Sequence, residues 1–316
     1  MNSNTTILKS EMKKYPIATF VVFAMLISWA GWIPFAATQA GLWTVKVPAE
    51  LVWLAEFGPT LSAFIVTWLI YGKTGLSNLM NKLLMWKVNY KWYLLSIFIT
   101  PVFILFSIGI DILFFGTKYD WTLLNDWDKS FITRTEAFTP SLGLISGIVS
   151  FMKTGTLATA LMFLLLALTN GGLSEEVGWR GFALKEFQRK PYNVLLASLF
   201  VAILWAVWHT GTLFWKTMMT SGFSEGLLFA FTYLLQYLLL IFPLSVIYTV
   251  LFNGTGGSIF LAIILHAFYN ISISVITAAY PGFPMLTFVI CMLVFSIILI
   301  VALWRNKTYN KSIQSV

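Results

Sequence analysis

Residues 170–180 read Asn-Gly-Gly-Leu-Ser-Glu-Glu-Val-Gly-Trp-Arg and directly follow the apolar run 157–169. Together the two segments are long enough to lie inside a bilayer, where charged side chains are poorly solvated. Two carboxylates and an arginine in such a place therefore indicate a functional site. On a helix, Glu176 and Arg180 lie one turn apart and can pair on one face, whereas Glu175 projects ~100° away from that face. We therefore expect a structural role for Glu176 and a chemical role for Glu175.

The composition of the whole chain is that of a polytopic membrane protein. Of its 316 residues 59% are hydrophobic and only 10% are charged, which leaves no room for a sizeable soluble domain. The single cysteine, Cys291, excludes a disulfide within the chain. The net charge of +8 is expected to mark cytoplasmic loops of a membrane protein, so that no nucleic-acid partner is predicted.

Apolar segments of spanning length predict an all-α protein with about eight transmembrane helices in a single integral membrane domain, residues 1–316. The expected spans are 15–37, 51–71, 92–115, 156–190, 193–214, 226–252, 258–280 and 285–304. Gly58-Pro59 is expected to kink the second span. The connection 116–154 is rich in aromatic and charged residues and is expected to lie at the membrane interface, with a short helix over 141–152.

The basic residues predict the orientation of these spans. If both termini are cytoplasmic and the spans alternate, only six of the 20 Lys and Arg residues fall on the outer side. This bias agrees with the positive-inside rule and predicts an N-in, C-in topology. Glu56 and Asp111 then lie near the outer ends of spans, where we expect them to be interfacial and without function. Most Trp and Phe side chains are expected to face lipid or the interface.

Helix geometry predicts that several polar residues meet at one depth. Glu175 and His209 are equally far along the chain from Tyr192, where the fourth and fifth spans turn. Both residues therefore lie roughly 25 Å from that turn on antiparallel helices. His266 is ~13 Å from the cytoplasmic end of its span, and Asn270 follows on the same helical face. The four residues are thus expected to share a pocket in the cytoplasmic half of the membrane.

Such a group of residues is suited to the activation of water. A partly desolvated carboxylate at Glu175 can act as a general base. His209 can contact the same water or deliver a proton to a leaving amine. His266 and Asn270 can donate hydrogen bonds to an oxyanion as it develops.

Three motifs in this order carry a resemblance to a known family. They are Glu-Glu-x-x-x-Arg at 175–180, an aromatic residue followed four positions later by histidine at 205–209, and His-x-x-x-Asn at 266–270. Their order and their placement on membrane helices resemble the CPBP family, the CAAX-protease and bacteriocin-processing membrane proteins also called the Abi family. One departure is Trp205, where the family more often has phenylalanine, and we expect it to affect packing rather than chemistry.

The resemblance implies an intramembrane endopeptidase of the CAAX prenyl endopeptidase type in a bacterial cell membrane. Its catalytic residues would be Glu175, His209, His266 and Asn270. Glu176 and Arg180 would support them, on helices within 156–280, and no cofactor would be required. The partners would be the lipid bilayer and a membrane-associated or C-terminal, CAAX-like peptide that enters from the cytoplasmic side.

Three alternatives stay open at this point. A zinc-dependent variant would use Glu175, His209 and His266 as ligands, although the chain has no His-Glu-x-x-His motif. A proton-coupled transporter could use the same intramembrane groups, but the chain shows no internal symmetry between two halves. A non-catalytic bacteriocin-immunity or scaffold protein could have the same fold.

Overall fold

The computed structural model describes residues 3–45, 47–138, 144–189 and 194–304, and these residues form helices without any strand. Seven helical segments within them are long and apolar enough to cross a membrane. Six are the single helices α2 (Pro16–Gln39), α5 (Tyr90–Phe115), α11 (Val194–Ser221), α12 (Phe223–Gly254), α13 (Ile259–Ala279) and α14 (Met285–Trp304). The seventh is the continuous run Thr156–Gln188. The predicted all-α, polytopic membrane fold is therefore confirmed.

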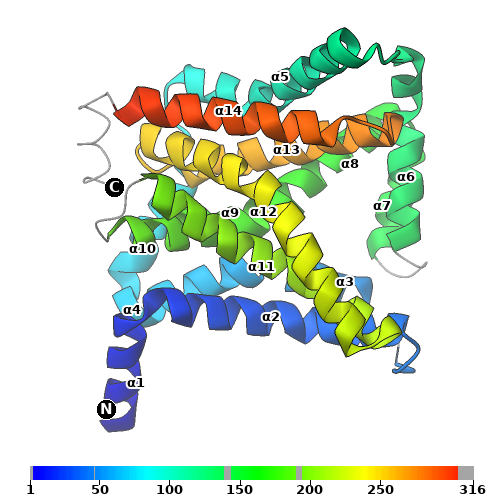
Figure 1. The fold of residues 1–316 in the computed structure, drawn as a ribbon. Coiled ribbons are helices and arrows are strands. Elements are labelled where there is room, and N and C mark those ends of the chain that lie inside the picture. Colours follow the sequence, from blue (N-terminus) through cyan, green and yellow to red (C-terminus); the bar gives the residue numbers. More distant parts are fainter. Residues whose placement is uncertain (1–2, 46, 139–143, 190–193, 305–316) are drawn as a thin grey trace.

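The predicted second span, 51–71, is divided between two helices, α3 (Ala49–Ala55) and α4 (Gly58–Leu83). The division falls at the expected kink. Inside α4 a second bend occurs at Gly72, whose φ of 64° and ψ of −155° suit a residue without a side chain. Because the part of α4 beyond this bend is polar, α4 is absent from the seven apolar segments although its first half runs among them (Figure 1).

The ends of the chain share one edge of the molecule. Figure 1 shows α1 (Ser3–Lys14), α10 (Lys185–Gln188), the polar part of α4 and the end of α14 on the same side. An N-in, C-in protein requires this arrangement, while the assignment of that side to the cytoplasm stays a prediction. The opposite edge carries the short elements η1 (Trp121–Asp126), α6 (Trp127–Phe138) and α7 (Leu144–Met152), where the sequence predicted an interfacial connection with a short helix.

The run that contains the two glutamates is an irregular helix at the centre of the bundle. It consists of α8 (Thr156–Ala167), η2 (Leu168–Leu173), α9 (Ser174–Gly178), η3 (Trp179–Leu184) and α10. Both η2 and η3 are π-helical, and such wide turns are frequent at functional sites. The Thr60 hydroxyl donates to the Leu173 carbonyl oxygen at 2.7 Å, which ties α4 to the end of η2.

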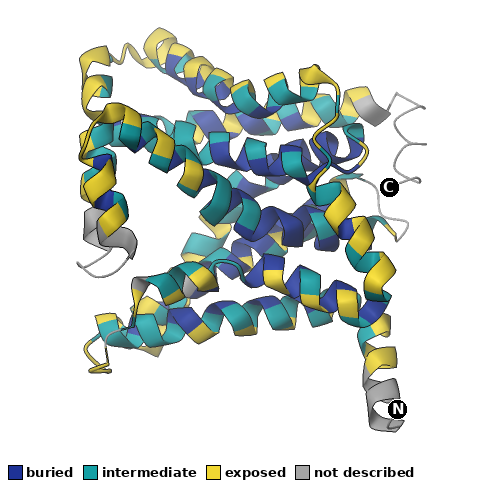
Figure 2. Cartoon of the chain, turned by 180° about the vertical axis from the view of Figure 1, so that it is seen from behind, coloured by how far each residue is buried: buried dark blue, intermediate teal, exposed yellow. Residues whose placement is uncertain are grey.

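Glycine allows the glutamate helix to touch its neighbour directly. A Cβ added to Gly178 would lie 2.6 Å from the Cβ of Pro59, which is closer than real Cβ contacts. Every residue of α9 is buried, and Figure 2 shows the buried residues gathered in the middle of the bundle. Both carboxylates therefore lie in the buried centre of the bundle.

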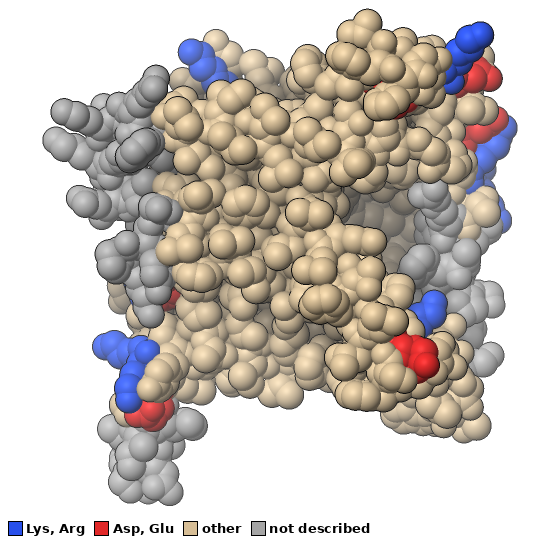
Figure 3. Space-filling view, viewed as in Figure 1, with Lys and Arg blue, Asp and Glu red and all other residues tan. Residues whose placement is uncertain are grey.

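The charged residues at the surface lie where a membrane protein is expected to have them, but some tryptophans do not. Figure 3 shows a face on which the visible Lys, Arg, Asp and Glu residues lie toward the edges, as a membrane-spanning surface requires. Several tryptophans are exposed, but Trp179, Trp205 and Trp208 are among the largest fully buried side chains. The Trp208 indole donates to Ser28 Oγ at 2.9 Å, which joins α11 to α2. The prediction that tryptophans mostly face lipid is therefore wrong for the three around the glutamates.

Candidate active site

The two carboxylate oxygens of Glu175 have different surroundings. Oε2 accepts hydrogen bonds from the indole Nε1 of Trp179, at 3.1 Å, and from the indole Nε1 of Trp205. Oε1 lies 3.8 Å from Nε2 of His209. The two indoles therefore hold one oxygen in place, and the other faces the histidine.

The hydrogen bonds of His209 determine which ring nitrogen faces the carboxylate. Its Nδ1 lies 3.1 Å from the backbone carbonyl oxygen of Trp205, which can only accept. Nδ1 therefore carries the proton, and the lone pair of Nε2 points toward Glu175. The ring packs against Trp208 and Tyr237, with centroid distances of 4.7 and 4.8 Å. The His209 side chain is 26% exposed, so the site is accessible on this side.

Glu176 has a second histidine and a buried arginine as partners. Its Oε1 lies 2.7 Å from Nδ1 of His266, and its Oε2 lies 3.3 Å from Nε of Arg180. The expected pairing of Glu176 with Arg180 is therefore present, and both side chains are fully buried. The Arg180 guanidinium also lies 4.6 Å from the ring centroid of Trp205 and 4.1 Å from that of Tyr248. Two aromatic faces thus supplement the carboxylate in stabilising this buried charge.

His266 and Asn270 lie against the backbone of the glutamate helix. Because Glu176 engages Nδ1 of His266, Nε2 is the ring nitrogen left for a substrate. A Cβ added to Gly171 would lie 3.0 Å from that Nε2 and 2.4 Å from Nδ2 of Asn270. Only glycine at this position leaves room for both nitrogens, and this places them together beside η2.

Trp205 lies between the two glutamate–histidine pairs. Its ring centroid is 6.1 Å from that of His209 and 5.6 Å from that of His266. The structure thus brings together all four residues that the sequence singled out for chemistry, with Glu176 and Arg180 beside them. The expectation that Trp205 affects packing alone is wrong, because its indole N–H donates to Glu175.

Sequence reasoning also missed residues around Glu175. Trp179 follows Glu175 by one helical turn, so its spacing alone could have indicated the contact. Glu56, at the end of α3, is half-buried and interacts electrostatically with Glu175 and with Tyr237. The sequence did not predict this proximity to Glu175, and the interfacial depth of Glu56 stays a prediction. Asp111 accepts a hydrogen bond from the Tyr119 hydroxyl at 2.7 Å, away from these residues.

The alternative of a zinc ligand set finds no support in this geometry. Within the described ranges, no group of three or more His, Cys, Asp or Glu residues is arranged to hold a metal ion. The Trp205 ring lies between His266 and the Glu175–His209 pair, with its centroid 5.6 Å from that of His266 and 6.1 Å from that of His209.

A polytopic helical bundle that encloses two glutamate–histidine pairs has the plan of an intramembrane peptidase. Comparison with known proteins agrees with this class. Residues 156–272 match the family model described as type II CAAX prenyl endopeptidase Rce1-like. The chain is also 26% identical over 270 residues to a CAAX prenyl protease 2 of Methanococcus maripaludis, and the match covers 84% of each chain.

These two matches support the CPBP family that the motifs resemble, and they support a peptidase of the CAAX prenyl endopeptidase type. The matched residues include all seven positions of the three motifs. This assignment favours a peptidase over a transporter.

Proposed function

We propose that this protease hydrolyses a peptide bond with a water molecule activated by Glu175, and that no metal cofactor is required. The observation that carries the proposal is that the two carboxylate oxygens of Glu175 have different neighbours. Two indole donors fix Oε2, while Oε1 faces the Nε2 lone pair of His209 at 3.8 Å. A water molecule can donate one hydrogen bond to each of these two acceptors, which orients its own lone pair toward a substrate carbonyl.

In the proposed reaction Glu175 Oε1 takes one proton from this water as the oxygen attacks the peptide carbonyl carbon. The carbonyl oxygen becomes an oxyanion, which the side-chain amide of Asn270 and the ring of His266 would stabilise through Nδ2–H and Nε2–H. Glu175 then passes its proton to the leaving nitrogen as the C–N bond breaks. The products are a carboxylic acid and an amine, and the Glu175 carboxylate is restored.

Glu176 and Arg180 have a positioning role in this proposal. The Glu176 carboxylate holds Nδ1 of His266 at 2.7 Å and therefore directs Nε2 toward Gly171 and Asn270. Arg180 balances the charge of Glu176 in a place without water. Neither side chain contacts the reacting atoms.

The proposed substrate is a membrane-associated or C-terminal, CAAX-like peptide that enters from the cytoplasmic side. The relative from Methanococcus maripaludis bears the name of a CAAX prenyl protease, which supports this substrate class. The peptide has to be unwound at the cleaved bond, because a helix engages its carbonyl groups in internal hydrogen bonds. Cytoplasmic approach rests on the distribution of basic residues, and a bacterial cell membrane stays a prediction.

The decisive experiment measures hydrolysis of CAAX-type peptides, with and without a prenyl group, by purified protein. We expect Glu175→Gln to abolish hydrolysis while the thermal unfolding temperature stays near that of the wild type. Glu225→Gln, at an exposed glutamate of α12, is the matched control and should keep full activity. Activity of wild type and control that persists in a chelator would agree with metal-free chemistry.

Two results would contradict the proposal. Full activity of a folded Glu175→Gln protein would remove Glu175 from the chemistry. A folded wild-type protein that binds these peptides but never cleaves them would favour the immunity or scaffold alternative.

A further inference from the structure

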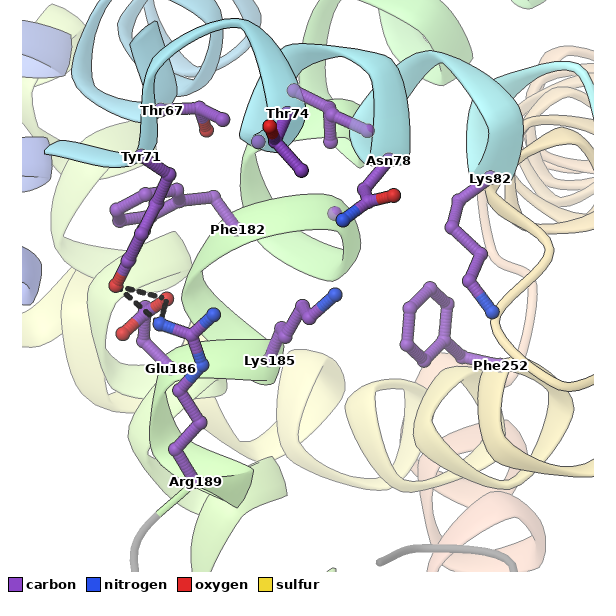
Figure 4. A pocket seen from close by; sticks show the side chains of 13 residues that line it. Thr67, Tyr71, Thr74, Asn78, Lys82, Phe182, Lys185, Glu186, Arg189 and Phe252 are labelled. Atoms are coloured by element: carbon purple, nitrogen blue, oxygen red, sulfur yellow. Dashed lines mark hydrogen bonds and ion pairs between the residues drawn. The ribbon is translucent and has the colours of Figure 1, made fainter. Parts of the chain in front are cut away.

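A second cavity lies outside the glutamate site, at the edge of the molecule that carries α1 and α10. Its volume is about 250 Å³, and it separates the polar part of α4 from η3 and α10 (Figure 4). The polar and charged side chains that line it are Thr67, Tyr71, Thr74, Asn78, Lys82, Lys185, Glu186 and Arg189. Nothing in the proposed hydrolysis uses these residues.

One wall of this cavity is the part of α4 that follows the bend at Gly72. Thr74, Asn78 and Lys82 are spaced by four residues, so they share one face of this part of α4. Figure 4 shows this face turned toward Lys185, which projects from α10.

The only carboxylate among the lining residues already has partners. Glu186 Oε1 lies 2.7 Å from Nη1 of Arg189 and accepts a hydrogen bond from the Tyr71 hydroxyl at 3.0 Å. Arg189 also lies over the Tyr71 ring, 4.5 Å from its centroid. This closed group occupies one end of the cavity and leaves the two lysines at the other end without a carboxylate.

The charges at the lysine end do not balance. Lys185 has the positive charges of Arg189 and Lys82 near it, besides the Glu186 carboxylate that Arg189 already engages. Lys82 is half-buried and donates a hydrogen bond to the backbone carbonyl of Gly256. Two ammonium groups, with the Asn78 amide and the Thr74 hydroxyl beside them, form the donor set that binds a phosphate group.

An open groove of about 560 Å³ adjoins the cavity and shares Glu186 and Arg189 with it. Its walls are mostly apolar and come from the beginning of α2, with Ile17, Val21 and Val22, and from Leu204 of α11. The apolar groove and the basic cavity therefore lie on either side of the Glu186–Arg189 ion pair. A phospholipid likewise has an apolar acyl chain next to a charged phosphate.

We propose that the cavity and the groove together bind one anionic phospholipid, with the phosphate at Lys82, Lys185 and Asn78 and an acyl chain along Ile17, Val21 and Leu204. The position at the helix ends, on the predicted cytoplasmic side, is where lipid phosphates lie and where basic pockets between membrane helices hold headgroups. The bound lipid would join the polar part of α4 to the helix that carries Glu175.

The test compares lipid binding by purified, delipidated protein in a neutral detergent, using native mass spectrometry and thermal unfolding. Phosphatidylglycerol should bind and raise the unfolding temperature more than phosphatidylcholine does. The double variant Lys82→Gln, Lys185→Gln should weaken phosphatidylglycerol binding by about 30-fold. The matched control Lys87→Gln, Lys91→Gln removes two exposed lysines outside the cavity and should bind as the wild type does.

Two further variants separate the headgroup from the acyl chain. The double variant Lys82→Arg, Lys185→Arg retains both positive charges and should keep most of the phosphatidylglycerol binding. It provides a second test if the glutamine variant does not fold. Ala18→Trp fills the groove and should weaken phosphatidylglycerol binding without changing the response to inorganic phosphate.

Three results would overturn the proposal. Equal loss in the two glutamine double variants would indicate a general charge effect. A stabilisation by inorganic phosphate equal to that by phosphatidylglycerol would indicate a site for a soluble phosphate. Displacement of phosphatidylglycerol by the free carboxylate of a CAAX-type peptide would assign the cavity to the substrate.

Discussion

Glu175 and Glu176 are adjacent in the chain, and each faces a histidine, yet their surroundings differ. Glu176 is closed on both sides: it holds His266 at 2.7 Å and Arg180 at 3.3 Å, and the His266 side chain is only 5% exposed. Glu175 is closed on one side only, because its histidine stands 3.8 Å away and is 26% exposed. A step of one residue, about 100° around the helix, therefore separates a buried ion pair from a carboxylate that can meet water and substrate. Identical side chains acquire different roles from the helices they face.

The largest expected effect concerns His209 in the Glu175–His209 pair, which we call the open pair. His209→Ala removes the acceptor that would orient water beside Glu175. Misplacing a reacting group can cost about 10²-fold, so we expect kcat to fall by about that amount while the unfolding temperature changes little. Hydrolysis of the CAAX-type peptide and a thermal unfolding curve on the same preparation check this. A His209→Ala protein with unchanged kcat would assign the open pair to binding alone.

For the buried Glu176–Arg180 pair, which we call the closed pair, we expect a loss of stability rather than a loss of kcat. Arg180→Ala leaves the Glu176 carboxylate buried without its cation, and breaking such a pair costs about 3–5 kcal/mol. The yield of folded protein and its unfolding temperature should therefore fall sharply, and the kcat of the surviving protein should fall less than in His209→Ala. Normal unfolding of Arg180→Ala together with lost hydrolysis would mean that Arg180 acts in the chemistry.

Trp205 gives a finer comparison, because it touches both pairs. Trp205→Phe keeps an aromatic ring beside Arg180 but removes the N–H that donates to Glu175. A hydrogen bond to a charged group contributes ~1.5 kcal/mol, so we expect kcat to fall about tenfold with KM nearly unchanged. The pH profile of kcat should shift as well. If the pH profile and kcat of Trp205→Phe are unchanged, Trp205 has a packing role only.

The smallest expected effect concerns the side of the membrane from which the substrate reaches Glu175 and His209. In a Cys291→Ala background, a cysteine placed by Lys190→Cys should react with membrane-impermeant reagents only from the cytoplasm, without loss of hydrolysis. Lys190 lies outside the residues that the structure describes, so labelling is an independent measure of topology. Reaction from the outer side would invert the protein and move the substrate to the other face.

Local spacing explains what could be predicted of the site. Glu176 with Arg180, and His266 with Asn270, are each one helical turn apart, so their faces follow from the sequence. The equal sequence distances of Glu175 and His209 from Tyr192, where the sequence predicts a turn, predicted that the two residues meet, because helices have a constant rise. The same one-turn spacing relates Trp179 to Glu175, and this contact was missed because tryptophans were assigned to the membrane surface.

The sequence by itself determined the helical membrane fold and the residues that meet in the bundle, because apolar length and helical period act within one segment. Only the tertiary structure decided which histidine each glutamate faces, that Trp205 donates to Glu175, and that Glu56 approaches the site. These contacts join different helices, and their geometry depends on rotation and on breaks such as Gly72. Small shifts in such packing change hydrogen-bond partners without changing the apolar pattern, so no periodicity in the chain records them.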